Sequence, residues 1–251
     1  MSEAPLLVAR KVSKVFDKFI ALASVDLQLH RGERRALIGP NGAGKSTFIS
    51  VIGGQQAGGP GGSVHFDGRD ISGALPHVIA RLGIGRTFQI SRTFLKLTVF
   101  ENMLAAMLPS RGGALSLGRG RLAALRDPSM EMLSQVGLAD LAGEAVETIS
   151  HGDRKRLEFG MVLAGEPRLL LLDEPTAGMG LAERGELMEM MVRHIAKRDI
   201  TLLFVEHDID IVFRFADVIT VMARGRVFAE GTPAQIAADR CVQDIYLGVG
   251  H

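Results

Sequence analysis

Short apolar runs separated by turn residues make up most of the first 70 positions. Residues 6–9 are continuously apolar, while Val25, Leu27 and Leu29 alternate with polar neighbours, as in a half-buried strand. The pair Asp67-Gly68 ends another strand-like run with a dipeptide that favours tight hairpin turns. This pattern predicts an antiparallel sheet close to the N-terminus.

The pattern changes to helical spacing between about residues 94 and 163. Apolar side chains recur there every three or four positions, as on the buried face of a helix. Gly112-Gly113 and Asp127-Pro128 interrupt this periodicity, so we expect the helices to break at both places. The segment is interpreted as an inserted helical subdomain.

The C-terminal third combines strand and helix patterns. Apolar runs at 169–172 and 200–205 flank a helical stretch at 181–197, an order typical of a parallel sheet with a crossover helix. Residues 218–229 indicate a hairpin around Arg224-Gly225, followed by a short helix near Pro233. The chain is therefore predicted to have an α/β fold.

Composition narrows the functional classes. The 251 residues are 47% hydrophobic and can bury a large core, and 29 basic against 28 acidic residues provide no general attraction to nucleic acid. A single cysteine, Cys241, excludes an internal disulfide. We see no leader at the N-terminus and no run of about 18 apolar residues, so we expect the chain not to cross a membrane.

The most specific motif is a glycine-rich stretch that fits G-x-x-x-x-G-K-[ST]. Glycines let backbone N–H groups surround phosphates, Lys45 reaches the β- and γ-phosphates, and Ser46 offers a hydroxyl to Mg²⁺. A strand-like run precedes it and a helix-like run follows, which places the anion at a helix N-terminus. The residues predicted to hold the nucleotide are Gly39, Pro40, Asn41, Gly42, Ala43, Gly44, Lys45, Ser46 and Thr47.

Polar side chains follow two later apolar runs. Asp173 comes after four leucines and would lie at the carboxyl end of a central strand, where it can hold Mg²⁺ through water. Glu174 would then face the γ-phosphate and deprotonate the attacking water, and His207 could donate a hydrogen bond to that phosphate. Buried strands often end in an acid, and histidines at strand ends are often merely solvated. These residues are therefore interpreted as functional because the phosphate-binding motif occurs in the same chain.

In this order, the motifs resemble the nucleotide-binding cassette of ABC transporters over nearly the whole chain. Residues 39–47 match the Walker A motif, Gln89 the Q-loop, 149–153 the signature motif, 169–174 Walker B and His207 the switch histidine. The resemblance implies a P-loop NTPase with a RecA-like parallel sheet core, an antiparallel β subdomain and an inserted α-helical subdomain. It implies one domain over 1–251, with the core and β subdomain in 1–88 and 164–251 and the helical subdomain in 89–163.

The resemblance also assigns roles. It implies ATP and Mg²⁺ as cofactors, with Lys45, Glu174 and His207 as catalytic residues and with Ser46, Gln89 and Asp173 at the metal. Phe16 falls where the family's A-loop aromatic stacks on adenine, although an ordinary core phenylalanine is the alternative. Ser150 and Gly152 would contact the γ-phosphate bound by an opposite cassette.

Two segments depart from the common family pattern. The signature usually reads L-S-G-G-Q, but His151 replaces its first glycine and Asp153 its glutamine. The segment after Walker B, often S-A-L-D, is Ala-Gly-Met-Gly at 177–180 and lacks the aspartate that acts across the dimer.

These departures resemble the branch that serves branched-chain amino acid and urea importers. Its other marks are Arg86-Thr-Phe-Gln, Leu157-Glu158, Glu206-His-Asp208 and Tyr246-Leu-Gly. The implied function is an ATPase that energises uptake of branched-chain or other hydrophobic amino acids. A urea or amide importer and the lipopolysaccharide-export ATPase remain alternatives within the branch.

The resemblance implies several partners. They are a second cassette, the same or a homologous chain, that completes an ATP sandwich, membrane permeases, and indirectly an external binding protein, with no nucleic acid. The chain would be peripheral at the cytoplasmic face of the inner membrane. Within 90–100, Phe94, Leu95, Leu97 and Val99 are candidates to contact permeases, with core packing as the alternative.

Two other function classes compete. A soluble ABC ATPase of DNA repair or translation usually has two cassettes or a long coiled coil, and neither is apparent here. A regulatory module that binds ATP without hydrolysis would fit the altered signature, but it would not need Lys45, Asp173, Glu174 and His207 together.

Overall fold

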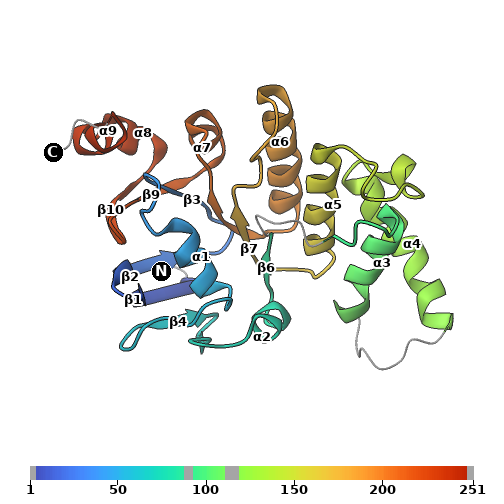
Figure 1. Ribbon diagram of the computed structural model, residues 1–251, viewed down its shortest axis with the longest axis horizontal. Helices are drawn as coiled ribbons and strands as arrows, with labels where there is room; N and C mark the ends of the chain where they lie inside the picture. The colour runs from blue at the N-terminus through green and yellow to red at the C-terminus, as the bar shows by residue number, and fades with distance from the viewer. Residues whose placement is uncertain (1–3, 88–92, 111–118, 248–251) are drawn as a thin grey trace.

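Two β-sheets organise the computed structural model, which describes residues 4–87, 93–110 and 119–247 (Figure 1). The strands are β1 Leu7–Phe16, β2 Phe19–Leu29, β3 Arg34–Ile38, β4 Ser63–Phe66, β5 Arg69–Asp70, β6 Ile84–Arg86, β7 Leu169–Asp173, β8 Thr201–Val205, β9 Val218–Ala223 and β10 Arg226–Gly231. The helices are α1 Lys45–Ile52, α2 Pro76–Arg81, α3 Val99–Ser110, α4 Arg119–Gln135, the 3₁₀ turn η1 Ala139–Leu141, α5 His151–Leu163, α6 Leu181–Lys197, α7 Ile209–Phe215, α8 Pro233–Ala238 and α9 Arg240–Leu247.

The larger sheet has the strand order β10-β9-β3-β8-β7-β6. Strands β6, β7, β8, β3 and β9 run parallel to their neighbours, and only β10 is antiparallel. The crossover from β7 through α6 to β8 and the β9–β10 hairpin were both predicted, and both predictions are confirmed. Because β3, β7 and β8 are parallel neighbours, their carboxyl ends meet at one edge, the usual position of a ligand site.

Alternating side chains of the central strands fill two separate cores. Leu170 and Leu172 pack on the same side as α5, α6 and α7, while Leu169 and Leu171 face α1 and the smaller sheet. All four are fully buried. A strand that is apolar on both faces is stable only when both faces are covered, which explains the unbroken run of leucines.

The smaller sheet has the order β2-β1-β4-β5 and antiparallel pairing throughout. Val25, Leu27 and Leu29 are buried on β2, whereas the intervening Asp26 and Gln28 are exposed. The predicted half-buried strand is thus confirmed, as is the turn at Asp67-Gly68 between β4 and β5.

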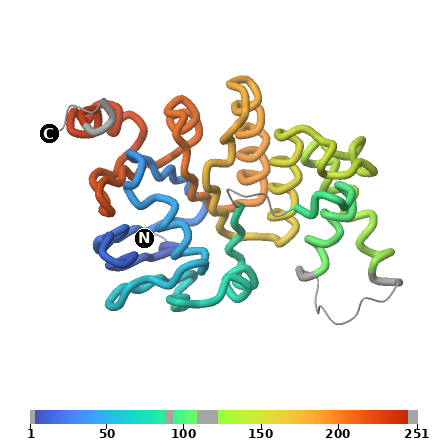
Figure 2. Tube along the Cα trace, viewed as in Figure 1, coloured from blue at the N-terminus to red at the C-terminus, as the bar shows by residue number. Residues whose placement is uncertain are grey.

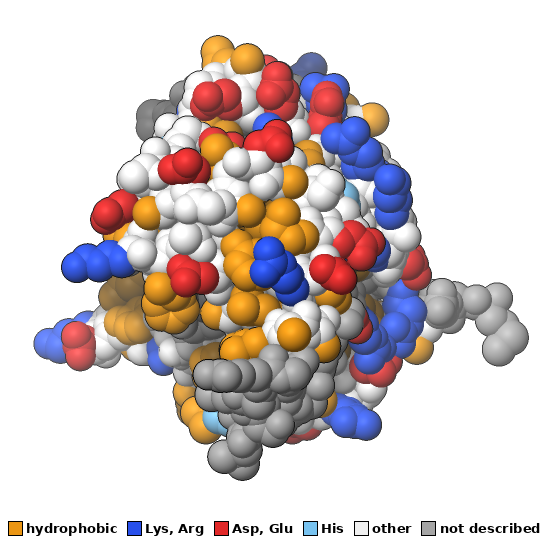
Figure 3. Space-filling view, turned by 90° about the vertical axis from the view of Figure 1, so that its right-hand side faces the viewer, with side chains coloured by type: hydrophobic (Ala, Val, Ile, Leu, Met, Phe, Trp, Pro, Cys, Tyr) orange, Lys and Arg blue, Asp and Glu red, His pale blue; other side chains and the backbone are white. Residues whose placement is uncertain are grey.

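Helices α3, α4 and α5 lie between β6 and β7 in the chain and form a group of their own on the right of the molecule (Figure 1). The chain enters this part after β6 and returns at β7, as the colour change along the trace shows (Figure 2). At this end, hydrophobic side chains gather near the middle of the face, among acidic and basic ones (Figure 3).

One expectation within this helical part is wrong. Helix α4 continues through Pro128, where a break was expected. Proline removes one N–H bond from a helix, but Leu125 and Met132 are buried on either side of it and fix the helix against the core. The fully buried Ser129 adds a hydroxyl contact to the sulfur of Met107 at 3.4 Å. The other expected break, Gly112-Gly113, lies outside the described residues.

Candidate active site

The glycine-rich loop joins β3 to α1, and its backbone requires glycine. Gly39, Gly42 and Gly44 all have positive φ angles, of 147°, 78° and 100°. A Cβ atom on Gly39 would lie 2.1 Å from the carbonyl oxygen of Met222, and one on Gly44 would lie 2.5 Å from that of Ala21. The close approach of two neighbouring backbone segments therefore excludes larger residues at two of the three positions.

Helix α1 starts inside this loop without a side-chain cap. Its N-cap is Gly44, and no side chain bonds the first amides, so their N–H groups and the helix dipole are available to an anion. The buried ammonium of Lys45 donates to the carbonyl oxygens of Gly39 at 2.7 Å and Pro40 at 3.1 Å. Burial lowers the pKa of Lys45, while Glu174 and Asp173 act in the opposite direction.

Asp173 ends β7 and contacts the loop directly. Its Oδ1 accepts a hydrogen bond from the Ser46 hydroxyl at 3.1 Å, and its Oδ2 lies 3.3 Å from the guanidinium of Arg86. Burial raises the pKa of Asp173, although the bond from Ser46 and the charge of Arg86 oppose this. Of the three predicted metal residues, Ser46 and Asp173 are thus brought together, and Gln89 lies outside the described residues.

Arg86 is a site residue that the sequence motifs do not identify. It ends β6, which pairs with β7, and also donates to Gln55 and to the Ser50 hydroxyl. Arg86 lies close to Asp173 because β6 is the strand next to β7. The order of the motifs along the chain does not predict this pairing.

Glu174 and His207 form a pair beside the loop. The Nε2 atom of His207 lies 2.9 Å from Oε1 of Glu174. Glu174 has a φ of 51°, the left-handed region that is costly for a side chain other than glycine, and its amide donates to the carbonyl of Val205 at 3.0 Å. Parallel pairing of β7 with β8 holds the two strand ends together and so sets this distance.

Glu206 holds the segment after Glu174 in place, and it too was missed as a site residue. Its buried Oε1 accepts hydrogen bonds from the amide of Thr176 at 3.0 Å and from its hydroxyl at 2.7 Å. Burial raises the pKa of Glu206, against these bonds. The motif Glu206-His-Asp208 indicates the branch but gives this carboxylate no role.

The loop, Glu174 and His207 share one cavity of about 180 Å³. Its aromatic wall is Phe19. Phe16 is the register partner of Phe19 at the end of the β1–β2 hairpin, is 41% exposed, and carries the ammonium of Lys14 at 5.2 Å from its ring centre. The alternative of a core phenylalanine at position 16 is therefore wrong.

Ser150 and Gly152 stand apart from this cavity, at the start of α5. The Ser150 hydroxyl caps the helix, accepting from the Asp153 amide at 3.1 Å and donating to its carboxylate at 2.7 Å. Among the described residues that line the cavity, none comes from α5. Gln89 lies outside the described residues.

The four candidates for permease contact differ in exposure. Phe94, Leu95 and Leu97 are 58%, 47% and 38% exposed, whereas Val99 is fully buried. Val99 is therefore a core residue, because it starts α3 and packs into the main core. Over the described part of the chain, no helix is long and apolar enough to span a membrane.

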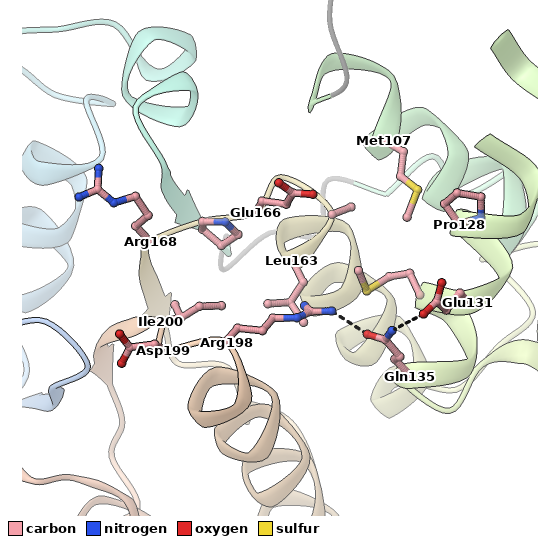
Figure 4. Close-up of a pocket in the computed structure, with 13 residues that line it drawn as sticks. Met107, Pro128, Glu131, Gln135, Leu163, Glu166, Arg168, Arg198, Asp199 and Ile200 are labelled. Atoms are coloured by element: carbon pink, nitrogen blue, oxygen red, sulfur yellow. Dashed lines mark hydrogen bonds between the residues drawn. The ribbon is translucent and has the colours of Figure 1, made fainter. Parts of the chain in front are cut away.

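A larger cavity, of about 470 Å³, lies between the helical part and the core (Figure 4). Arg198 donates to Gln135 at 2.7 Å, and Gln135 in turn donates to Glu131 at 3.3 Å. No described residue of the glycine-rich loop lines it. It is thus separate from the phosphate-binding site.

The fold and this site define a P-loop nucleotide-binding protein, and comparison with known proteins gives its family. The family model described as ABC transporter matches residues 22–177, and one described as branched-chain amino acid ATP-binding cassette transporter matches residues 226–251. The chain belongs to the ABC transporter family, as an ATP-binding subunit similar to those of branched-chain amino acid transporters.

Two relatives illustrate this similarity. The high-affinity branched-chain amino acid transport ATP-binding protein BraF of Pseudomonas aeruginosa is 33% identical, over 97% of this chain and 98% of its own. The probable branched-chain amino acid transport ATP-binding protein LivG of Archaeoglobus fulgidus is 36% identical, over 97% and 95%.

Solved structures confirm the fold class. The ADP conformation of MJ1267, an ATP-binding cassette of an ABC transporter, is 29% identical and superposes with a TM-score of 0.85 over 98% of this chain and all of that one. A dimeric post-hydrolysis state of the cassette MJ0796, bound to ADP and Pi, is 25% identical with a TM-score of 0.77 over 90% and 98%.

Proposed function

We propose that this chain is the ATP-hydrolysing subunit of an ABC importer for branched-chain or other hydrophobic amino acids. The observation that carries the proposal is the convergence, in one cavity, of the glycine-rich loop with the Glu174–His207 pair, next to the Ser46–Asp173 contact. The amino acid substrate rests on the relatives' names and on the C-terminal family model.

Binding of ATP would use the loop amides and Lys45. The Lys45 ammonium, bonded to two loop carbonyls, would exchange those bonds for the β- and γ-phosphates. Phosphate oxygens are charged and make stronger hydrogen bonds than amide carbonyls, so this exchange is favourable. Phe16, exposed at the hairpin end, would stack on adenine.

The residues present also fit Mg²⁺. A hydroxyl and a carboxylate oxygen 3.1 Å apart are the hard donors that this ion prefers, and phosphate oxygens and water would complete its shell. We assign Ser46 and Asp173 to it, with Gln89 as a third candidate. When bound, the ion would neutralise charge that develops on the phosphates.

Hydrolysis would use Glu174 as the general base. Its carboxylate takes a proton from water as the water oxygen bonds to the γ-phosphorus, and the bond from that phosphorus to the bridging oxygen breaks, leaving ADP and phosphate. The imidazole of His207 donates to a γ-phosphate oxygen. Its present bond to Glu174 keeps both side chains beside the loop.

A second cassette would complete the site. Ser150 and Gly152 lie outside the cavity of their own chain, so they are free to contact a nucleotide on a facing copy or homologue. The dimeric cassette MJ0796 supports this arrangement. ATP would then join the two cassettes, and its hydrolysis would release them.

Membrane permeases, and through them an external binding protein, would be the further partners. The exposed Phe94, Leu95 and Leu97 offer an apolar contact, and we place the chain as a peripheral subunit on the cytoplasmic face of the membrane.

The proposal is tested in vesicles that contain the chain and its permeases. Uptake of labelled leucine should require internal Mg-ATP and should release phosphate, whereas vesicles with the Lys45→Ala chain should do neither. Urea uptake in place of leucine, or leucine uptake without ATP, would contradict the proposal.

A further inference from the structure

A cavity of about 240 Å³ opens between β6, α3 and α5, away from the glycine-rich loop. Its walls are mostly apolar and include Ala106, Met161 and Val162. Four polar side chains also line it, namely Arg86, Thr87, Thr93 and Glu158. An acid inside an apolar cavity needs a partner, because burial of an unpaired charge is costly.

Glu158 is nine-tenths buried and poorly satisfied. Its side chain is 10% exposed, and within 4–87, 93–110 and 119–247 neither of its oxygens accepts a hydrogen bond. Lys155, one turn earlier on α5, approaches Oε2 only to 3.8 Å. The hydroxyl of Thr87 likewise has no hydrogen-bond partner in that part of the chain.

The other cation at this cavity is committed elsewhere. Arg86 lines the same walls, but its terminal nitrogens bond to Asp173, Gln55 and Ser50 on the nucleotide side. Glu158 and Thr87 therefore line a space with room for a further donor, and among the described residues their buried side-chain oxygens have no hydrogen-bond partner.

We propose that Glu158 and Thr87 form an acidic socket for one arginine or lysine side chain of a permease. The inference rests on the proposed function for the identity of the partner and adds the chemistry by which it is recognised. The alkyl part of such a side chain matches the apolar walls, and its charged end supplies the missing donors.

The surroundings suit a partner with an apolar surface around that basic residue. Thr93 lines the cavity, and the exposed Phe94 and Leu95 follow it directly in the chain. A permease segment could thus bury apolar side chains on Phe94 and Leu95 while its basic side chain enters the socket.

The socket is tested first with a small probe. The free chain, labelled at its methionine methyl groups, is titrated with n-butylguanidinium and, in parallel, with the neutral n-butylurea. We expect the Met161 methyl signal to shift with the cation only, and the Glu158→Gln variant to bind it at least tenfold more weakly. Equal shifts with both probes, or equal binding by the variant, would overturn the proposal.

Two further variants control this titration. Glu144→Gln removes the same charge at an exposed position and should bind the cation like the wild type. Arg92→Gln tests the chain itself as the source of the basic group: tighter probe binding by this variant would show that Arg92 competes for the socket, which would overturn the assignment to a partner.

The last experiment uses the complex. The Glu158→Gln variant should co-purify with the permeases at least tenfold less well than the wild type. Phosphate release by the free variant should stay unchanged, and its melting temperature should stay unchanged or rise. A fall in melting temperature with normal assembly would show a merely structural acid and overturn the socket. Because phosphate release is measured on the same sample, loss of ATPase activity would be recognised as failure of the proposed function instead.

Discussion

The imidazole Nε2 of His151 lies 3.1 Å from the carbonyl oxygen of Ala177. This contact joins the first residue of α5 to the segment after β7, so the two places where the sequence departs from the common family pattern touch each other. Gly178 faces the same ring: a Cβ there would lie 3.4 Å from Nε2, and its φ of 80° favours glycine. The histidine and the Ala-Gly-Met-Gly segment are therefore one structural feature.

The His151 contact predicts a small effect on stability. His151→Ala removes an exposed hydrogen bond and should lower the free energy of unfolding by about 0.5–1 kcal/mol, measured by urea denaturation. The exposed His77, changed to alanine in the same way, is the matched control and should have less effect. An equal effect of the two substitutions would show that the contact contributes nothing.

Glu174→Gln should keep ATP affinity and slow phosphate release by about 10²–10⁴-fold, because the amide retains the shape but cannot accept the proton. Glu166→Gln is a close control, since Glu166 has nearly the same left-handed φ of 50° but is exposed and lies outside the site. Unchanged turnover in Glu174→Gln would remove Glu174 from the role of base.

The same variant tests the second cassette. Glu174→Gln protein loaded with ATP in the absence of Mg²⁺ should sediment as a dimer, because it holds the nucleotide at the interface without hydrolysing it. An additional Ser150→Ala substitution should weaken that dimer if Ser150 contacts the opposite nucleotide. A monomer at all ATP concentrations would contradict the two-cassette site.

Lys45→Ala should abolish productive triphosphate binding. The Lys45 ammonium now donates to two loop carbonyls and would donate to the phosphates instead when ATP binds. A fluorescent ATP analogue measures the binding directly. Lys197→Ala, at the exposed end of α6, should bind normally. Normal titration of the Lys45 variant would exclude the loop as the phosphate site.

Asp173 predicts a pH dependence of stability. Burial raises the pKa of Asp173 in the folded chain above that of an ordinary aspartate. Its stabilising effect is therefore complete below the ordinary pKa and is lost as the pH rises through the folded-state pKa. Asn does not ionise, so the Asp173→Asn variant does not lose this stability. Without Mg²⁺, its free energy of unfolding relative to that of the wild type should therefore rise between pH 4 and pH 7.

Urea unfolding at the two pH values measures this difference. Added Mg-nucleotide should stabilise the wild type and not Asp173→Asn, because only the wild type retains the metal carboxylate. A stability difference that does not change with pH would contradict the raised pKa.

Much of the fold follows from local patterns in the sequence. Side-chain direction along a strand repeats every two residues. The alternation of Val25, Leu27 and Leu29 was therefore sufficient to predict β2 and its buried face. Four consecutive leucines were likewise sufficient to predict a strand that is buried on both faces. Glycine spacing in 39–47 was sufficient for the phosphate loop, because only glycine tolerates those φ angles beside neighbouring backbone.

Contacts between distant segments were decided by the tertiary structure alone. Hydrophobic periodicity specifies which face of an element is buried, but it contains no information on which strand is its neighbour or in what register. The Arg86–Asp173 contact, the Glu206 clamp on Thr176 and the open acceptors of Glu158 all depend on that neighbourhood. Helix α4 likewise passes Pro128 because packing on both sides outweighs the local preference to break.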